Sequence, residues 1–168
     1  MSGPDMLAAA DVGRRVQARS RSKYRSKREM VNHLRGVPLF SGLSGRHLRR
    51  IASLATVVSF SADRTIVERG VRGDSFYLIL IGSAKVFRGV VPTGRAIARL
   101  KRGDFFGEMA LLDGGPRSAT VVSEASLTAL KVPRSAFRRL LLREPLVAVR
   151  ILEAMAARTR DRGRSPSH

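Results

Sequence analysis

The residues best suited to chemistry stand close together between residues 103 and 121, in the segment GDFFGEMALLDGGPRSATV. Gly107 allows the backbone to approach a ligand closely, and the residues after it could open a helical turn whose first N–H groups lack partners. A phosphate group is favoured at such a turn by these donors and by the helix dipole. Arg117 adds a guanidinium fork that suits phosphate oxygens.

Glu108 does not fit a simple anion site, because a carboxylate repels a phosphate. It fits if the carboxylate accepts hydrogen bonds from a sugar hydroxyl. A phosphate, a ribose and a compact pocket together indicate a nucleotide ligand. The alternative is that Glu108 and Arg117 form a plain ion pair in a loop, which would leave the neighbouring glycines and small residues unexplained.

The runs FGEMALL and PRSATV resemble the phosphate-binding cassette of cyclic nucleotide-binding domains, and the resemblance covers roughly residues 37–160. Such domains occur in regulatory subunits of cAMP-dependent kinase, in bacterial catabolite-activator-type regulators and in nucleotide-gated channels. The resemblance implies that Glu108 binds the ribose 2′-hydroxyl and that Arg117 binds the cyclic phosphate. It implies these further ligand-binding positions around the phosphate: Gly107, Met109, Ala110, Ser118 and Ala119.

The base is expected to lie against the inner face of the barrel. By the resemblance, Val86, Ile97 and Ala98 line this face, although each could equally be ordinary barrel core. A residue of the C-terminal lid helix normally covers the base. Arg158 is the best candidate for it, with Met155 and Thr159 as the alternatives.

The resemblance favours cAMP as the ligand, because bacterial-looking members of the family mostly use it, and cGMP is the second choice. Ser118 leaves this choice open, since its hydroxyl could contact either the phosphate or the exocyclic amine of a syn guanine.

Short alternating or β-branched runs separated by glycines fill residues 56–132. Closely spaced strands with glycine turns are typical of a small antiparallel barrel or jelly roll. The predicted fold class is therefore α+β and mainly β, an antiparallel β-roll flanked by N-terminal and C-terminal helices. The predicted strands are 57–60, 65–68, 75–80, 83–88, 96–100, 119–123 and 127–132.

Helices are predicted on both sides of the roll. One covers 29–35 and ends at Gly36, and another covers 45–54 after a Ser44 cap. Pro133 should start a helix in its first turn. Pro145 marks either a break in that helix or the first turn of a second helix that reaches about residue 160.

Three segments are expected: a basic N-terminal arm and helix at 1–36, a cyclic nucleotide-binding domain at 37–160, and a polar tail at 161–168. Residues 14–28 form a basic run interleaved with serines, and we expect it to be mobile and available to an anionic partner, or to begin the first helix. The chain carries a net charge of +19, which would attract nucleic acid, acidic membranes or an acidic protein. Arginine makes up nearly all of this charge, so codon bias in a GC-rich genome is an alternative explanation.

The sequence also argues against several classes of protein. It has no Cys, no secretory apolar core and no apolar run long enough to span a bilayer, which favours a cytoplasmic protein. Its three His and scattered acidic residues form no evident triad, metal cluster or acid–base pair, so an enzyme is not expected.

Two functions are consistent with these features of the sequence. The first is a stand-alone cyclic nucleotide sensor whose lid and N-terminal helices move on binding to regulate an unknown protein or nucleic-acid partner, with a homodimer as a further option. The alternative is a protein associated with RNA, the ribosome or DNA through its basic arm, in which the nucleotide modulates binding or the pocket is vestigial.

Overall fold

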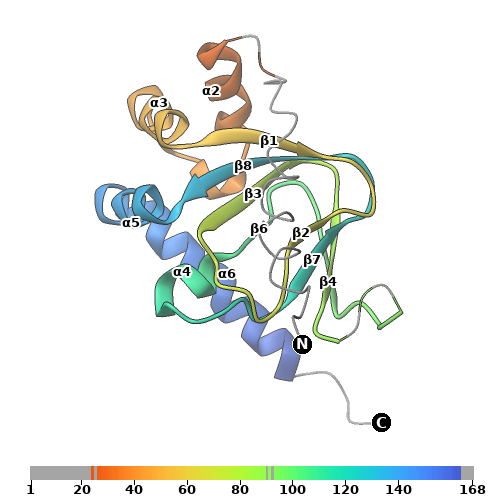
Figure 1. Cartoon of the computed structure of the whole chain (residues 1–168). Coiled ribbons are helices and arrows are strands. Elements are labelled where there is room, and N and C mark those ends of the chain that lie inside the picture. The colour runs from red at the N-terminus through yellow and green to blue at the C-terminus, as the bar shows by residue number, and fades with distance from the viewer. Residues whose placement is uncertain (1–23, 25, 90, 92, 164–168) are drawn as a thin grey trace, which may run out of the picture.

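The computed structural model describes residues 24, 26–89, 91 and 93–163, with side chains described up to residue 161. Two antiparallel four-stranded sheets face each other and form a roll (Figure 1). In spatial order the first sheet contains β1 (Thr56–Phe60), β8 (Leu127–Pro133), β3 (Ser75–Ile81) and β6 (Phe105–Phe106). The second contains β2 (Thr65–Val67), β7 (Thr120–Ser123), β4 (Ala84–Phe87) and β5 (Ala98–Leu100). The predicted β-roll fold class is confirmed.

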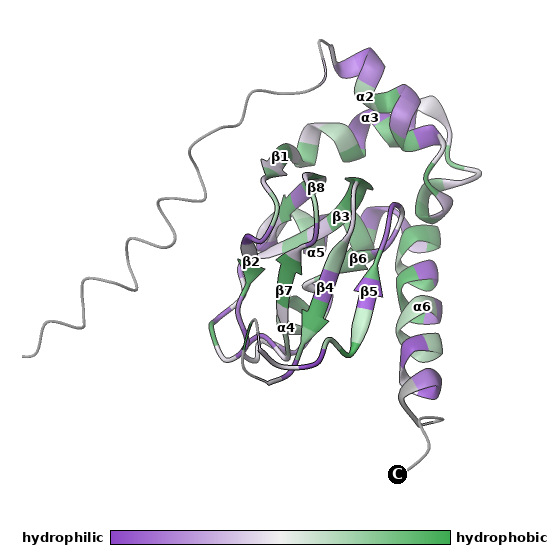
Figure 2. Cartoon of the chain, turned by 90° about the vertical axis from the view of Figure 1, so that its right-hand side faces the viewer, coloured by the Kyte–Doolittle hydropathy of each residue, from purple (hydrophilic) through white to green (hydrophobic). Residues whose placement is uncertain are grey.

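Helices precede, interrupt and follow the roll. The N-terminal group comprises α2 (Lys27–Arg35), the 3₁₀ turn η1 (Pro38–Phe40) and α3 (Gly45–Leu54), and α4 (Glu108–Asp113) lies between β6 and β7. After the roll come α5 (Arg134–Arg143) and α6 (Pro145–Gly163), and Figure 2 shows α6 running alongside the roll next to β5. No helix in the described part of the chain is long and apolar enough to cross a membrane.

Strand β3 is apolar at almost every position because both of its faces are covered. Successive side chains point to opposite sides of a strand. Phe76, Leu78 and Leu80 therefore join the core formed with the helices, whereas Tyr77 and Ile79 join the core inside the roll. The first sheet is thus a shared wall between two hydrophobic cores.

The short strand β6 was not predicted. Its two phenylalanines lie in the apolar run that precedes Gly107, and two residues are too few to show a periodic pattern. Pairing with β3 places them on opposite faces, so that Phe105 packs with the helices and Phe106 faces the interior of the roll.

The N-terminal helix begins earlier than predicted. Its N-cap is Ser26, whose side chain accepts a hydrogen bond from the Glu29 amide, and the helix takes in Lys27 and Arg28. Tyr24 is buried in the helical core, and its hydroxyl lies 2.9 Å from Nδ1 of His33. Of the two expectations for the run 14–28, the start of the first helix is confirmed for residues 26–28. A mobile run does not fit the buried Tyr24, and the rest of the run lies outside the described residues.

The other helix predictions are largely confirmed. Ser44 caps α3, and α5 follows Pro133, which serves as its N-cap and not as part of its first turn. Of the two roles considered for Pro145, the start of a second helix is confirmed, and that helix continues to Gly163. Val147 and Ile151 bury the first half of α6 in the helical core.

Glu144 is a buried carboxylate at the junction of α5 and α6. Only 2% of its side chain is exposed, and its Oε2 lies 2.6 Å from Nδ1 of His47 on α3. Its Oε1 lies 3.7 Å from Nη1 of Arg50 on the same helix. This carboxylate therefore joins α3 to the point where the C-terminal helices change direction.

The burial of Tyr24 predicts a stabilising role for the N-terminal segment. Tyr24→Ala in the full chain should lower the free energy of unfolding by about 3 kcal/mol, because loss of a buried ring leaves a cavity. Tyr24→Phe keeps the ring and removes the hydroxyl that lies against His33, so it should cost about 1 kcal/mol. Urea denaturation of both variants measures these changes, and an unchanged stability of Tyr24→Ala would contradict the packing described here.

Candidate ligand-binding site

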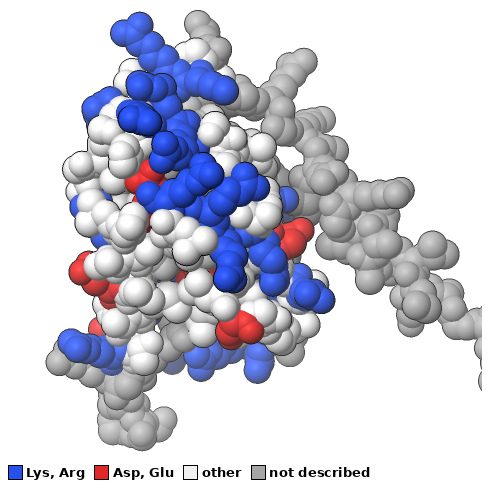
Figure 3. All heavy atoms as spheres, turned by 90° about the vertical axis from the view of Figure 1, so that its left-hand side faces the viewer, with Lys and Arg blue, Asp and Glu red and all other residues white. Residues whose placement is uncertain are grey.

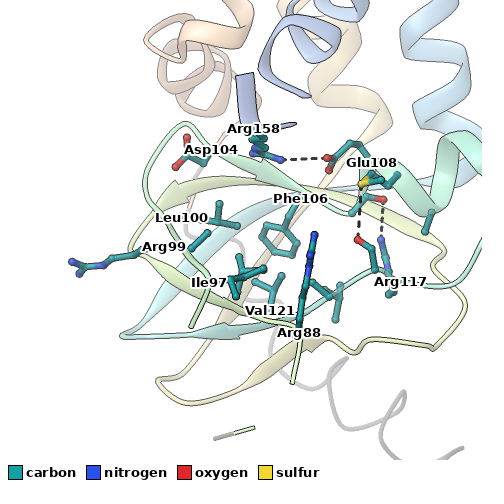
Figure 4. Close-up of a pocket in the computed structure, with 18 of the residues that line it drawn as sticks. Arg88, Ile97, Arg99, Leu100, Asp104, Phe106, Glu108, Arg117, Val121 and Arg158 are labelled. Carbon is teal, nitrogen blue, oxygen red and sulfur yellow. Dashed lines mark hydrogen bonds and ion pairs between the residues drawn. The ribbon is translucent and has the colours of Figure 1, made fainter. Parts of the chain in front are cut away.

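A cavity of about 560 Å³ opens between the second sheet, α4 and the C-terminal half of α6 (Figure 4). Its size falls in the roughly 300–1,000 Å³ range of small-molecule sites. All eleven residues predicted from the sequence line it, although they come from four separate parts of the chain. They are Val86, Ile97, Ala98, Gly107, Glu108, Met109, Ala110, Arg117, Ser118, Ala119 and Arg158.

Arg117 holds a fixed position at one end of the cavity. Its Nη1 donates a hydrogen bond to the carbonyl oxygen of Gly107 at 2.9 Å, and its Nη2 donates to that of Ser75 at 2.8 Å. Arg117 is 7% exposed, and no described carboxylate lies within the 4.0 Å of an ion pair with it.

The environment of this guanidinium is unfavourable for a charge. Burial lowers the pKa of Arg117 below its usual value, and nearby Tyr77, Asp74 and Glu108 oppose that shift. The two carbonyl hydrogen bonds compensate only in part for the hydration that a buried cation loses when it lacks a direct anionic partner. This end of the cavity is therefore suited to an anion, which would supply that partner.

Two glycines make room for the guanidinium. Gly107 has a φ of 90°, and a β-carbon there would lie 2.5 Å from Nη1 of Arg117 and 2.8 Å from the Ser75 oxygen. A β-carbon on Gly73 would lie 2.6 Å from Cζ of Arg117. The sequence indicated the importance of Gly107, whereas the role of Gly73 is evident only from the structure.

Glu108 lies at the start of α4 and pairs with Arg158. Nη1 of Arg158 donates to Oε1 of Glu108 at 3.2 Å, and Nη2 donates to the carbonyl oxygen of Phe105 at 2.6 Å. The Arg158 guanidinium also stands over the Phe105 ring, 4.5 Å from its centroid. The plain ion pair between Glu108 and Arg117 is therefore not formed, and the carboxylate instead anchors α6 to the cavity.

The opposite side of the cavity is an apolar wall. Val86 on β4 and Ala98 on β5 are paired across neighbouring strands, and Ile97 precedes β5 with 47% of its surface exposed. Phe106 and Val121 contribute to the same wall, and Figure 4 shows Phe106 directed toward it. Such a surface suits a flat, weakly polar group.

Several lining residues were missed by the sequence reasoning. The unpredicted polar ones are Arg88, Arg99, Asp104 and Asp161. Arg99 is also bound to Glu124 through its Nε, at 2.6 Å from Oε2, and Asp104 accepts the amide of Lys101 at 2.9 Å. None of these belongs to a local pattern, so only the tertiary structure could have placed them here.

Of the predicted residues that belong to the segment 103–121, two are exposed. Ser118 and Met109 are both exposed, and the Ser118 hydroxyl lies 3.9 Å from the Met109 sulfur. The side chain of Ala110, by contrast, is buried. The hydroxyl of Ser118 is therefore accessible to a ligand, whereas the Ala110 side chain serves packing.

Residues 57–144 match the sequence profile of the cyclic nucleotide-binding domain family. A cAMP-dependent protein kinase regulatory subunit of Aspergillus fumigatus is 38% identical over 120 residues, which cover 71% of this chain and 29% of that protein. A cGMP-dependent protein kinase, isozyme 1, of Drosophila melanogaster is 36% identical over 66% of this chain and 15% of its own. The chain thus spans less than a third of the length of these curated relatives.

The fold is also similar to that of solved structures of related proteins. The crystal structure of Thermus thermophilus catabolite activator protein aligns with a TM-score of 0.67 and 32% identity, over 75% of this chain and 60% of that one. The matching profile covers more than half of this chain and includes both Glu108 and Arg117. The chain belongs to the cyclic nucleotide-binding domain family.

Proposed function

We propose that the protein binds a cyclic nucleotide, with cAMP preferred to cGMP, and that binding repositions its helices to regulate a partner macromolecule. The observation that carries this proposal is Arg117, a buried guanidinium without a direct carboxylate partner, which lies across the cavity from its apolar wall. A cyclic phosphate carries the single negative charge that this position lacks.

The rest of the ligand follows from the distribution of polar and apolar groups. Glu108 is the acceptor for the ribose 2′-hydroxyl, and the wall of Val86, Ile97 and Ala98 receives the base. Guanine has more hydrogen-bonding groups than adenine, so burying it against this wall costs more unless each group finds a partner. The cAMP-dependent relative supports the same order of preference, with Ser118 as the residue that could favour cGMP.

Regulation requires that the ligand bind two conformations unequally, since equal affinity shifts no population. Arg158 links the cavity to α6, because it pairs with Glu108, the carboxylate that would bind the ribose. Further back along the chain, Glu144 joins the start of α6 to α3. A ligand that alters the Glu108–Arg158 pair therefore acts on helices at both ends of the domain.

A vestigial pocket was part of the alternative function. Such a pocket would be expected to have lost its charged groups or to be filled by larger side chains. The cavity of about 560 Å³ and the unpaired Arg117 favour a working site instead.

Replacing Arg117 tests the phosphate anchor. Arg117→Ala should weaken cAMP binding at least tenfold, roughly 1.4 kcal/mol or more, because it removes a charge-assisted bond. Arg117→Lys should give an intermediate affinity, since it keeps the charge but cannot hold both carbonyls with one fork. Calorimetry gives the dissociation constants of cAMP and cGMP for the unmodified protein and the two variants. Circular dichroism checks that each protein is folded. An unchanged dissociation constant in folded Arg117→Ala would rule out this anchor.

A second prediction concerns the ribose. Glu108→Gln should weaken cAMP by about 1–2 kcal/mol and should affect 2′-deoxy-cAMP much less, because the deoxy ligand lacks the hydroxyl. The two ligands are titrated against both proteins in the calorimeter. Equal losses for the two ligands would show that Glu108 acts through Arg158 and does not contact the sugar.

The third prediction concerns the lid. Arg158→Ala should accelerate cAMP release about three- to tenfold, because α6 loses its bonds to Glu108 and Phe105, worth about 0.7–1.4 kcal/mol. Arg160→Ala, an exposed change on the same helix, is the matched control. Stopped-flow displacement of a fluorescent cAMP derivative measures the rates. If the two variants release ligand equally fast, Arg158 has no role as a lid residue.

A further inference from the structure

The N-terminal helices carry an excess of exposed positive charge that the nucleotide site does not use. Five cations project from α2 and α3: Lys27, Arg28, Arg35, Arg46 and Arg49. Helix α5 packs against α3 and adds Arg138, Arg139 and Arg143, all exposed. Figure 3 shows Lys and Arg side chains gathered in a band over this side of the molecule, which we call the basic face.

A groove between α2 and α3 concentrates this charge. It has a volume of about 630 Å³, and Lys27, Arg28, Arg35 and Arg49 surround a floor that includes Val31 and Ala52. None of these four cations has a described carboxylate within 4.0 Å.

Two of the groove cations converge. At Gly45 a β-carbon would stand 3.4 Å from Nη2 of Arg35 and 3.3 Å from Nη1 of Arg49, so guanidinium groups from two helices both approach Gly45. Like charges this close repel each other unless an anion lies between them. Two converging guanidinium forks are well suited to the oxygens of a phosphate group.

The extent of the basic face favours a repeating anion over a single compact phosphate. The cations continue from the groove along α3 and onto α5, as the phosphates of a nucleic acid do along its backbone. An acidic protein fits less well, because protein interfaces have an apolar centre. Among the described residues of α2, α3 and α5, Leu142 at the end of α5 is the one exposed large apolar side chain, and none lies at the groove.

The aromatic residues distinguish a duplex from a single strand. Proteins that bind single strands stack the bases on exposed aromatic side chains. All seven Phe and both Tyr residues of this chain are buried, and it has no Trp. The basic face therefore offers charge without a stacking surface.

We propose that the basic face binds the phosphate backbone of a nucleic-acid duplex without reading its sequence. The binding is electrostatic and releases one counterion for each phosphate neutralised. The duplex and the cyclic nucleotide would contact different residues, because no residue of the groove lines the ligand cavity.

The test compares two double variants of the full chain that lose equal charge. Arg35→Gln with Arg49→Gln removes the converging pair, whereas Arg72→Gln with Arg95→Gln removes two exposed cations from loops of the roll. Both retain the N-terminal segment, so any contribution from it is the same in each. Fluorescence anisotropy with a duplex of about 20 base pairs, over about 50 to 200 mM salt, gives the affinity and its salt dependence.

The Arg35/Arg49 variant should bind at least tenfold more weakly at the lowest salt, with a salt slope shallower by about 1.8, at about 0.9 per lost phosphate contact. The Arg72/Arg95 variant should keep the affinity within about twofold and nearly the full slope. Thermal unfolding and cAMP titration show whether both variants are folded.

Three outcomes would overturn the proposal. The first is an absence of duplex binding by the unmodified chain at the lowest salt. The second is an equal loss in the two folded variants, which would show that total charge and not this groove decides binding. The third is displacement of the duplex by polyglutamate at the same charge concentration as by unlabelled duplex, which would indicate an acidic protein partner.

Discussion

Arg117 sets the geometry of the whole cassette, because its guanidinium is buried and its hydrogen bonds go to main-chain carbonyls. Carbonyls are fixed by the fold, so the end of the Gly107 turn and the start of β3 must both lie within reach of one side chain. A buried charge cannot shift to a less satisfied position without a cost of several kcal/mol. Room for it exists only where Gly73 and Gly107 lack side chains. The site is therefore rigid where charge is recognised.

The shared wall connects this rigid site to the helices. Phe105 and Phe106 are neighbours in the chain but belong to different cores, one with the helices and one inside the roll. Arg158 bonds to the carbonyl of Phe105 and lies over its ring, so α6 is attached at the very strand that separates the two cores. Arg134 adds a second link, because it donates to the Gly73 carbonyl from the first turn of α5. Packed cores resist small deformations, so these contacts provide the route by which a shift at the cavity would reach the helices in the proposed mechanism.

The two proposed sites lie in different parts of the fold, and they would bind anions in different ways. In the proposed nucleotide cavity, one buried guanidinium would bind the phosphate where solvent screens little. The basic face uses many exposed cations that salt screens strongly. Glu144 lies between the two regions, since it joins the C-terminal helices to α3 through His47. Its burial makes this joint costly to break, because a buried carboxylate without partners is unfavourable.

The amino-acid pattern alone was enough to predict the roll and to single out Glu108 and Arg117, the charged residues of the segment 103–121 that line the cavity. Glycine-separated β-branched runs have few other ways to bury themselves, and Gly107, Glu108 and Arg117 stand close enough in the chain for local geometry to bring them together. Tertiary contacts decided the rest. The pairing of Glu108 with Arg158 spans 50 residues, and the strand β6 exists only because β3 lies beside it. Tyr24 looked like part of a solvated basic run, yet its ring is buried against helices that follow it. Such contacts depend on which faces meet after folding, and no short stretch of residues carries that information.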